Sequence, residues 1–164
     1  MVGGDAGPNS IGLYAAGLAI ALGASVTYLD HRPGRLAIAA ALGATVIDGL
    51  PPRKAGTFPI TVDASGSPAG LRCALNSTAP DGTCTSPSVY LEDPSVPMLA
   101  MYSRCCTLHT GRAHARPAIP AVLDLVTGGF DPSAIPSAVV TRADAAEALA
   151  RPPMKLVITC TASA

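Results

Sequence analysis

The sequence predicts one α/β domain over residues 1–164, with a doubly wound sheet of six parallel strands and helices on both faces. Short β-branched runs alternate with alanine-rich segments of helical periodicity, a pattern typical of parallel sheets covered by helices. Four tyrosines, two phenylalanines and no tryptophan favour thin, closely packed helices over an aromatic-rich β-sandwich. The length suits one domain, and 49% hydrophobic residues can supply its core. We expect the strand order 3-2-1-4-5-6.

The N-terminal half alternates strands and helices at short intervals. Met1–Gly4 is expected to be the end of a truncated first strand, which suggests a fragment of a longer protein. A helix follows from Ile11, with Ser10 as its N-cap and Gly23 at its end. The other elements expected in this half are strands over residues 25–30, 44–48 and 58–63 and helices over residues 35–42 and 67–79.

The C-terminal half contains more proline between its apolar runs. Pro80–Gly82 is a turn signal that separates the preceding helix from a strand over residues 83–89. Gly128 and Gly129 end an amphipathic helix over residues 118–127. The remaining elements expected are a helical turn over residues 98–102, strands over residues 105–110, 135–140 and 155–159, and a helix over residues 143–150.

A glycine-rich turn between the first strand and the first helix is the strongest local indication of a ligand site. A dinucleotide fingerprint needs glycine at the tight turn, at the closest approach to the diphosphate, and where helix meets strand. Gly7 and Gly12 supply the first and third of these, and Asn9 stands at the second. Taken alone, the turn fits a ligand-free strand–helix connection equally well.

An acid at the end of the second strand strengthens the nucleotide interpretation. Asp30 follows Gly12 by 18 residues, close to the offset of the acid that binds the adenosine ribose. A carboxylate there favours NAD, because it would repel a 2′-phosphate. Arg32 and Arg35 follow closely and could instead receive that phosphate, so NADP stays open. The alternative for Asp30 is an ordinary acid in a surface loop.

Other chemistries find little support. Asp63 ends the fourth strand, where open sheets bind ligands, but a structural role is favoured for it. No Tyr-x-x-x-Lys pair, P-loop lysine, Gly-x-Ser-x-Gly elbow, Cys-x-x-Cys or His-Glu-x-x-His motif occurs. We therefore expect no catalytic or metal-ligating residue, His109 as a structural residue, and the five cysteines as small core or strand residues.

Charge and hydropathy limit the partners and the compartment. The formal net charge is zero, which argues against nucleic acid as a partner. The most apolar stretch, residues 11–24, is shorter than the roughly 20 residues of a membrane-spanning helix. An odd number of cysteines without a signal peptide favours the cytoplasm.

The order of motifs resembles the coenzyme-binding, Rossmann domain of the medium-chain, zinc-type alcohol dehydrogenase and reductase family. The resemblance covers nearly the whole chain, and the order and spacing of the motifs are more specific than any one of them. They are Gly-x-x-x-x-Gly-Leu-Tyr-Ala-Ala at 7–16, Ala-Leu-Gly-Ala at 21–24, Leu29-Asp30 with Arg35, and the segments 41–45, 62–66, 125–132, 144–149 and 155–158.

The resemblance implies a set of cofactor-binding residues. The phosphate turn would comprise Gly7, Asn9, Ser10, Ile11 and Gly12, with Asp30 and Arg35 at the adenosine ribose. Lys155 would lie near the diphosphate, although a strand-end lysine in solvent is the alternative. The remaining expected residues are Ala64, Ser65 and Gly66 beside the cleft, Ser86 on the nicotinamide side, and His109 with its backbone near the carboxamide.

The resemblance also implies a larger enzyme. In this family a separate catalytic domain supplies the zinc ligands, and the present sequence contains none of it. The parent enzyme would transfer hydride between an alcohol or carbonyl substrate and NAD, or NADP, while the isolated chain would only bind the dinucleotide. A homodimer is expected through the strand edge near residues 105–110. The alternative is a non-catalytic nucleotide-sensing or dimerisation module with the same fold.

Overall fold

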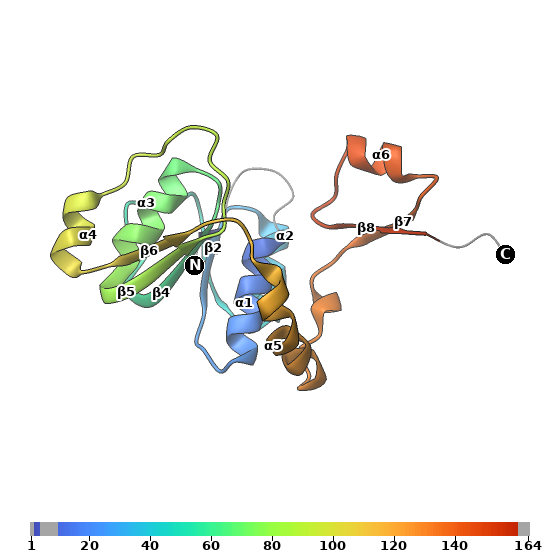
Figure 1. Cartoon of the computed structure of the whole chain (residues 1–164), viewed down its shortest axis with the longest axis horizontal. Helices are drawn as coiled ribbons and strands as arrows, with labels where there is room; N and C mark the ends of the chain where they lie inside the picture. The colour runs from blue at the N-terminus through green and yellow to red at the C-terminus, as the bar shows by residue number, and fades with distance from the viewer. Residues whose placement is uncertain (1, 4–9, 161–164) are drawn as a thin grey trace.

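The largest sheet has six parallel strands, which the computed structural model describes over residues 2–3 and 10–160 (Figure 1). Neighbouring strands follow the order β3-β2-β1-β4-β5-β6. These strands are β1 (Val2–Gly3), β2 (Thr27–Asp30), β3 (Thr45–Asp48), β4 (Phe58–Ala64), β5 (Thr78–Ser86) and β6 (Thr107–Thr110). A separate parallel pair consists of β7 (Ala138–Thr141) and β8 (Leu156–Thr159). The predicted α/β class with parallel strands is confirmed.

Helices cover both faces of the six-stranded sheet. Adjacent residues of β2 point to opposite faces, and Tyr28 and Leu29 accordingly belong to different hydrophobic clusters. The Tyr28 cluster includes Leu13 and Leu36 of the first two helices, whereas the Leu29 cluster includes Leu71 of the third helix. The helices are α1 (Ile11–Ala21), α2 (Pro33–Ala41), α3 (Pro68–Ser77), α4 (Met98–Arg104), α5 (Ala115–Thr127) and α6 (Ala145–Ala150).

Local sequence signals explain where most helices begin and end. Proline occupies the first turn of α2 and α3, where its missing N–H costs no helical hydrogen bond. The Ser67 side chain caps α3 by accepting a hydrogen bond from the Gly70 amide at 3.1 Å. Ser10 stands at the N-cap position of α1, but its side chain makes no capping hydrogen bond there. Gly23, with φ of +84°, follows the end of α1 as predicted.

The predicted turn at Pro80–Gly82 lies inside β5. Pairing between β4 and β5 shifts between Phe58, opposite Thr78, and Ile60, opposite Thr83. Between these two pairs β5 contains more residues than β4, which is a β-bulge. Asp81, one of the residues in this bulge, adopts a left-handed conformation with φ of 58°. The prediction of a turn between a helix and a strand was therefore wrong, because these residues form an irregularity within β5, which begins at Thr78.

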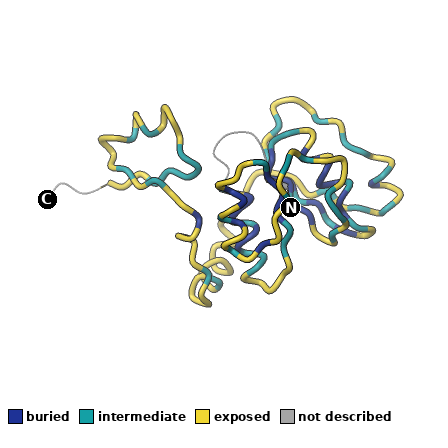
Figure 2. Tube along the Cα trace, turned by 180° about the vertical axis from the view of Figure 1, so that it is seen from behind, coloured by how far each residue is buried: buried dark blue, intermediate teal, exposed yellow. Residues whose placement is uncertain are grey.

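The segment 115–160, which we call the C-terminal arm, extends from one side of the sheet (Figure 1). Figure 2 shows that exposed and intermediate residues dominate it, whereas buried residues concentrate in the sheet and its helices. Ile135 is the arm's one buried residue in the described chain, and it packs with Leu13 and Tyr28. Phe130 also meets α1, because a Cβ built on Gly17 would lie 2.8 Å from its ring.

Within the described residues, no helix is long and apolar enough to cross a membrane.

Candidate functional site

Several predicted site residues lie at or just after the carboxyl ends of β2, β4 and β5, namely Asp30, Ala64, Ser65, Gly66 and Ser86. Gly7 and Asn9 lie outside the described residues. Ser10 is half-buried before α1, Ile11 is exposed at its first position, and Gly12 is buried. Strand β1 pairs with both β2 and β4, and the chain proceeds outward from it in opposite directions. Such a reversal of strand order creates the crevice in which open α/β sheets bind ligands.

Gly12 brings α1 close to the sheet. A Cβ at this position would meet the Ala64 Cβ at 3.4 Å and the Tyr28 ring at 3.5 Å. A methyl group would just fit at these distances, but a side chain larger than alanine would push the first turn of α1 away from β2 and β4. This is the helix–strand contact that the third glycine of a dinucleotide fingerprint provides.

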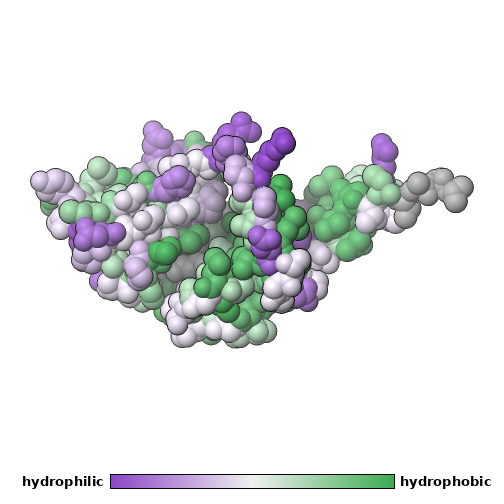
Figure 3. Space-filling view, turned by 60° about the horizontal axis from the view of Figure 1, so that its bottom comes forward, coloured by the Kyte–Doolittle hydropathy of each residue, from purple (hydrophilic) through white to green (hydrophobic). Residues whose placement is uncertain are grey.

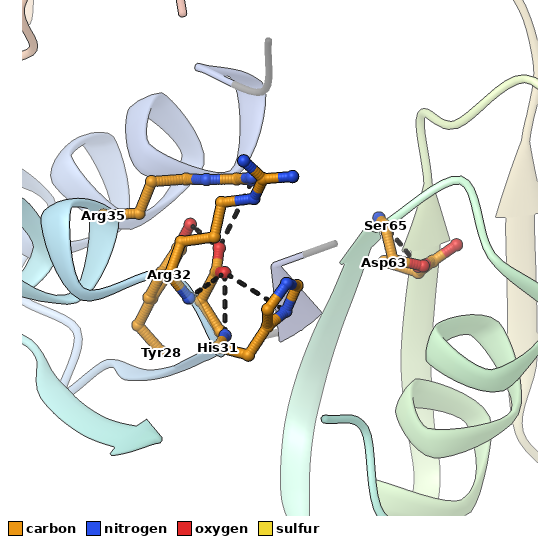
Figure 4. A network of polar contacts seen from close by, with 7 residues as sticks. Tyr28, His31, Arg32, Arg35, Asp63 and Ser65 are labelled. Carbon is orange, nitrogen blue, oxygen red and sulfur yellow. Dashed lines mark hydrogen bonds and ion pairs between the residues drawn. The ribbon is translucent and has the colours of Figure 1, made fainter. Parts of the chain in front are cut away.

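The Asp30 carboxylate is fully buried and accepts hydrogen bonds from its own turn. Figure 4 shows Tyr28, His31, Arg32 and Arg35 gathered at this end of the sheet. Oδ1 accepts from the backbone amides of His31 at 2.8 Å and Arg32 at 3.0 Å. Oδ2 accepts from the Tyr28 hydroxyl at 3.2 Å and lies 3.4 Å from Nη1 of Arg35, which is itself only 6% exposed. The His31 Nδ1 atom lies 3.8 Å from Oδ1. The contacts with His31 and Arg35 are longer than the hydrogen bonds to Asp30, so a ribose hydroxyl would replace them more easily.

Burial of the Tyr28 hydroxyl reinforces this arrangement. Burial, followed by the neighbouring Asp30 charge, raises the pKa of Tyr28 well above its ordinary value. The hydroxyl consequently stays protonated and donates to Asp30 throughout the physiological pH range. Tyr28 was not predicted as a site residue. Its position could have indicated the contact, because residues two apart on a strand lie on the same face and Tyr28 precedes Asp30 by two positions.

A second carboxylate, Asp63, joins the ends of β4 and β5. It is fully buried, and its Oδ1 accepts from the amide of Ser65 at 3.1 Å and from the hydroxyl of Ser65 at 2.5 Å. Its Oδ2 accepts from Ser86 Oγ at 2.8 Å and from the Tyr90 hydroxyl. These contacts give Asp63 the structural role favoured from the sequence.

The loop after β5 adds a further contact to this network. Ser88 donates to the Asp63 carbonyl at 3.1 Å, and its Oγ accepts from the Gly66 amide at 3.0 Å. Burial and the Asp63 charge raise the pKa of Tyr90 well above its ordinary value, so its phenol remains a donor. Ser88 and Tyr90 were not predicted, because loop residues carry no periodicity that would place them against Asp63.

A pocket of about 350 Å³ lies between the ends of β5 and β6 and the loop after β5, and Ser86 is the predicted nicotinamide-side residue among those that line it. Ser86 lines this pocket but directs its hydroxyl to Asp63. Ala64 and Ser65 are buried, Gly66 is half-buried, and His109 is exposed on β6. The lining residues are Leu71, Ser86, Tyr90, Asp93, Pro94, Val96, Leu108 and Thr110.

Lys155 reaches the first turns of α1 from the far end of the chain. Its Nζ donates to the Tyr14 hydroxyl and lies 4.7 Å from the centroid of the Tyr14 ring. Lys155 is half-buried, which differs from the alternative of a strand-end lysine in solvent. The structure therefore brings Lys155 to the same helix as Ser10 and Gly12.

The five cysteines differ in environment, and Cys106 is half-buried against the Leu29 cluster. Cys73 and Cys84 are buried, as predicted, and burial raises the pKa of both thiols. The prediction was wrong for Cys105 and Cys160, which are exposed. No group of three or more His, Cys, Asp or Glu side chains suited to a metal ion occurs among the described residues.

Among known proteins, the chain is similar to solved structures of dehydrogenases. The sequence matches no protein-family model, and no curated protein matches it. A 2R,3R-butanediol dehydrogenase from Bacillus subtilis is similar with a TM-score of 0.80 and 21% identity, over 98% of this chain and 52% of that one. An alcohol dehydrogenase from Thermus sp. ATN1 is similar with a TM-score of 0.76 and 26% identity, over 93% and 49%.

A short chain alcohol dehydrogenase from E. coli CFT073, complexed with NADH, has a TM-score of 0.74 and 19% identity, over 96% of this chain and 51% of that one. Two further similar structures contain NADP. These similarities concern the fold, and this chain spans about half the length of the proteins it matches.

Proposed function

We propose that this chain, whose fold is that of the coenzyme-binding domain of zinc-type, medium-chain alcohol dehydrogenases, binds a nicotinamide dinucleotide. The observation that carries the proposal is the convergence of three features at the reversal of strand order. These are the start of α1, held close to the sheet at Gly12, and the carboxylates of Asp30 and Asp63 at the ends of the two strands beside β1.

The described residues at the start of α1 fit a diphosphate. A helix N-terminus carries a partial positive charge, and the first turn of α1 contains no acidic residue to compensate it. Lys155 adds a full positive charge next to this helix. A diphosphate would be stabilised by both, with Ser10 and Ile11 closest to it and Gly12 holding the start of α1 against the sheet.

The adenosine ribose is proposed to bind beside Asp30 and Arg35. Replacement of the 3.4 Å contact between them would give each ribose hydroxyl a charged partner. The Asp30 charge favours NAD over NADP, because an added phosphate would meet a buried carboxylate. Arg32 and Arg35, which follow β2, would instead favour the 2′-phosphate of NADP. The affinities for both dinucleotides are therefore to be measured.

The nicotinamide is proposed to extend toward Ala64, Ser65 and Gly66, and then toward Ser86 and the backbone of His109. The pocket that Ser86 and Thr110 line supports this direction. When bound, the dinucleotide would supply the hydride that such enzymes exchange with their substrates. In this chain, Asp63 would act indirectly, by holding Ser65, Ser86 and Tyr90 in place.

We further propose that residues 1–164 form one domain of a longer oxidoreductase that acts on an alcohol or carbonyl substrate. The similar dehydrogenases are about twice as long, which supports a further domain in the longer protein. The catalytic zinc is proposed to belong to that domain. The β6 edge is proposed to pair two copies, since β6 is the outermost strand and Thr107, His109 and Thr110 are exposed. The alternative of a non-catalytic module is not favoured, because the similar proteins are dehydrogenases.

Calorimetric titration of the full 164-residue chain with NAD and with NADP tests the proposal. We expect saturable binding of at least one dinucleotide, and no oxidation of alcohols by the chain alone. Gly12→Val should weaken the binding by more than about tenfold, because the added methyl groups meet Ala64 and Tyr28.

Gly34→Val is the matched control, because a Cβ at Gly34 meets nothing within 4 Å. It should leave the affinity unchanged. Absence of binding of both dinucleotides to the unmodified chain, with no shift of its melting temperature, would contradict the proposed function.

A further inference from the structure

We infer that Tyr14 is a positioning residue, which holds the Lys155 ammonium group beside the start of α1 for contact with the diphosphate. The inference rests on the proposed function and adds a residue to it. Tyr14 is the fourth residue of α1, and helical side chains of this kind point back toward the helix N-terminus. The Tyr14 side chain therefore lies on the side where the diphosphate is proposed to bind.

Tyr14 contacts Lys155 in two ways. Its hydroxyl accepts a hydrogen bond from Lys155 Nζ, and its ring faces the same ammonium group at 4.7 Å from the centroid. The Tyr14 hydroxyl in turn donates to the Pro132 carbonyl at 3.2 Å. An ammonium group has three N–H donors, and this arrangement uses one of them on Tyr14.

The backbone on either side of these contacts is held by the same hydrophobic cluster. Ile135 is buried in it, Met154 packs against it, and Tyr14 itself is partly buried there. Pro132 and Lys155, which bond Tyr14, therefore each lie within three residues of an anchored side chain. The contact joins residues 141 positions apart, so Lys155 depends on the fold of the arm for its place.

The charge balance indicates that the ammonium group serves an anion. Lys155 lies beside a helix that has no acidic residue in its first turn and a positive N-terminal end. Tyr14 is a neutral partner, so it fixes the position of the ammonium group without cancelling its charge. A flexible lysine would lose side-chain entropy upon binding a phosphate, and Tyr14 lowers that loss by ordering the side chain beforehand.

The test compares ADP, which contains the diphosphate, with adenosine, which lacks it, as ligands of the full chain. Lys155→Met should weaken ADP binding about tenfold, the size expected for a charge-assisted hydrogen bond, and leave adenosine binding unchanged. Tyr14→Phe keeps the ring and should weaken ADP binding about threefold. Tyr14→Leu removes both contacts and should approach the effect of Lys155→Met.

A double variant separates an effect of Tyr14 on the position of Lys155 from an effect of Tyr14 on the stability of the fold. In a Lys155→Met chain, Tyr14→Phe should cause no further loss of ADP affinity, because its partner is already absent. Tyr102→Phe is the matched control, since Tyr102 is 83% exposed on α4 and should have no effect. Melting temperatures of all variants report any separate loss of stability.

Equal weakening of ADP and adenosine by Tyr14→Phe, or an undiminished effect in the Lys155→Met chain, would overturn the inference while leaving the proposed function intact. Failure of the unmodified chain to bind either ADP or a nicotinamide dinucleotide would overturn both.

Discussion

The sheet body, residues 2–110, encloses two hydrophobic clusters, whereas the C-terminal arm adds one buried side chain to them. Both regions are rich in aliphatic residues. In the body, Leu13, Leu29 and Leu75 are at most 1% exposed, but in the arm Leu123 and Leu149 are 57% and 61% exposed. Figure 3 shows hydrophobic surface on the arm accordingly. Similar composition therefore gives a self-sufficient core in one region and not in the other.

Helix α5 illustrates what this difference teaches. Ile119, Val122, Leu123 and Val126 follow the spacing of one helix face, yet each is at least 36% exposed. Amphipathic periodicity predicts that a helix forms and which side is apolar. It does not predict whether the same chain supplies the surface that covers that side.

The largest contrast should come from removing a buried leucine in the body. Leu75→Ala is expected to lower the free energy of unfolding by about 3 to 4 kcal/mol, because Leu75 is fully buried and its removal leaves a cavity. Leu149→Ala on α6 is the matched control and should change it by less than about 0.5 kcal/mol. Urea unfolding of both variants measures the difference, and equal losses would refute the comparison.

Ile135→Ala should weaken the attachment of the C-terminal arm to the sheet body. We expect a loss of about 2 to 3 kcal/mol, because this is the fully buried hydrophobic residue that joins the arm to α1 and β2. Limited proteolysis should then cleave within residues 115–160 sooner than in the unmodified chain. Val139→Ala, at a site 63% exposed, is the control and should leave the cleavage rate unchanged.

Alkaline pH should destabilise the body selectively. Burial raises the pKa values of Cys73 and Cys84 above the ordinary 9.0, so the folded chain holds their protons more tightly than the unfolded chain. The resulting stabilisation is complete below about pH 9 and is lost progressively as the pH rises above it. Cys84→Ala should make the urea midpoint less sensitive to pH in this range. A slope identical to that of the unmodified chain would contradict the expectation.

The smallest effect is expected for an ion pair on the arm. Arg151 and Glu147 of α6 lie 3.2 Å apart, but both side chains are about four-fifths exposed. Arg151→Ala should change the free energy of unfolding by less than about 0.5 kcal/mol, since solvent and salt screen the pair. Arg35→Ala is the contrasting variant and should cost more, because its partner Asp30 is fully buried and would lose the guanidinium 3.4 Å from its Oδ2. Urea unfolding at low and high salt should separate the two.

Much of the fold follows from local sequence. Glycine and proline mark the ends of α1 and α3, and Asp30 does end a strand beside β1. The contacts of Asp30 are local in the sequence, but the contacts that join Asp63 to the loop after β5 and Lys155 to α1 are not. Tyr90 reaches Asp63 across 27 positions, and Lys155 reaches Tyr14 across 141, and no periodicity records such a pairing. The turn inside β5 was misjudged for a related reason, because only pairing with β4 reveals that the strand continues past Asp81.

The contact between Gly17 and Phe130 has a consequence for how this chain can vary. The missing Cβ leaves a notch in α1 that receives the edge of the aromatic ring. Alanine at position 17 would fill that notch and displace the ring, unless a smaller residue replaced the phenylalanine at the same time. The two positions are thus expected to change together, even though they lie 113 positions apart in the sequence.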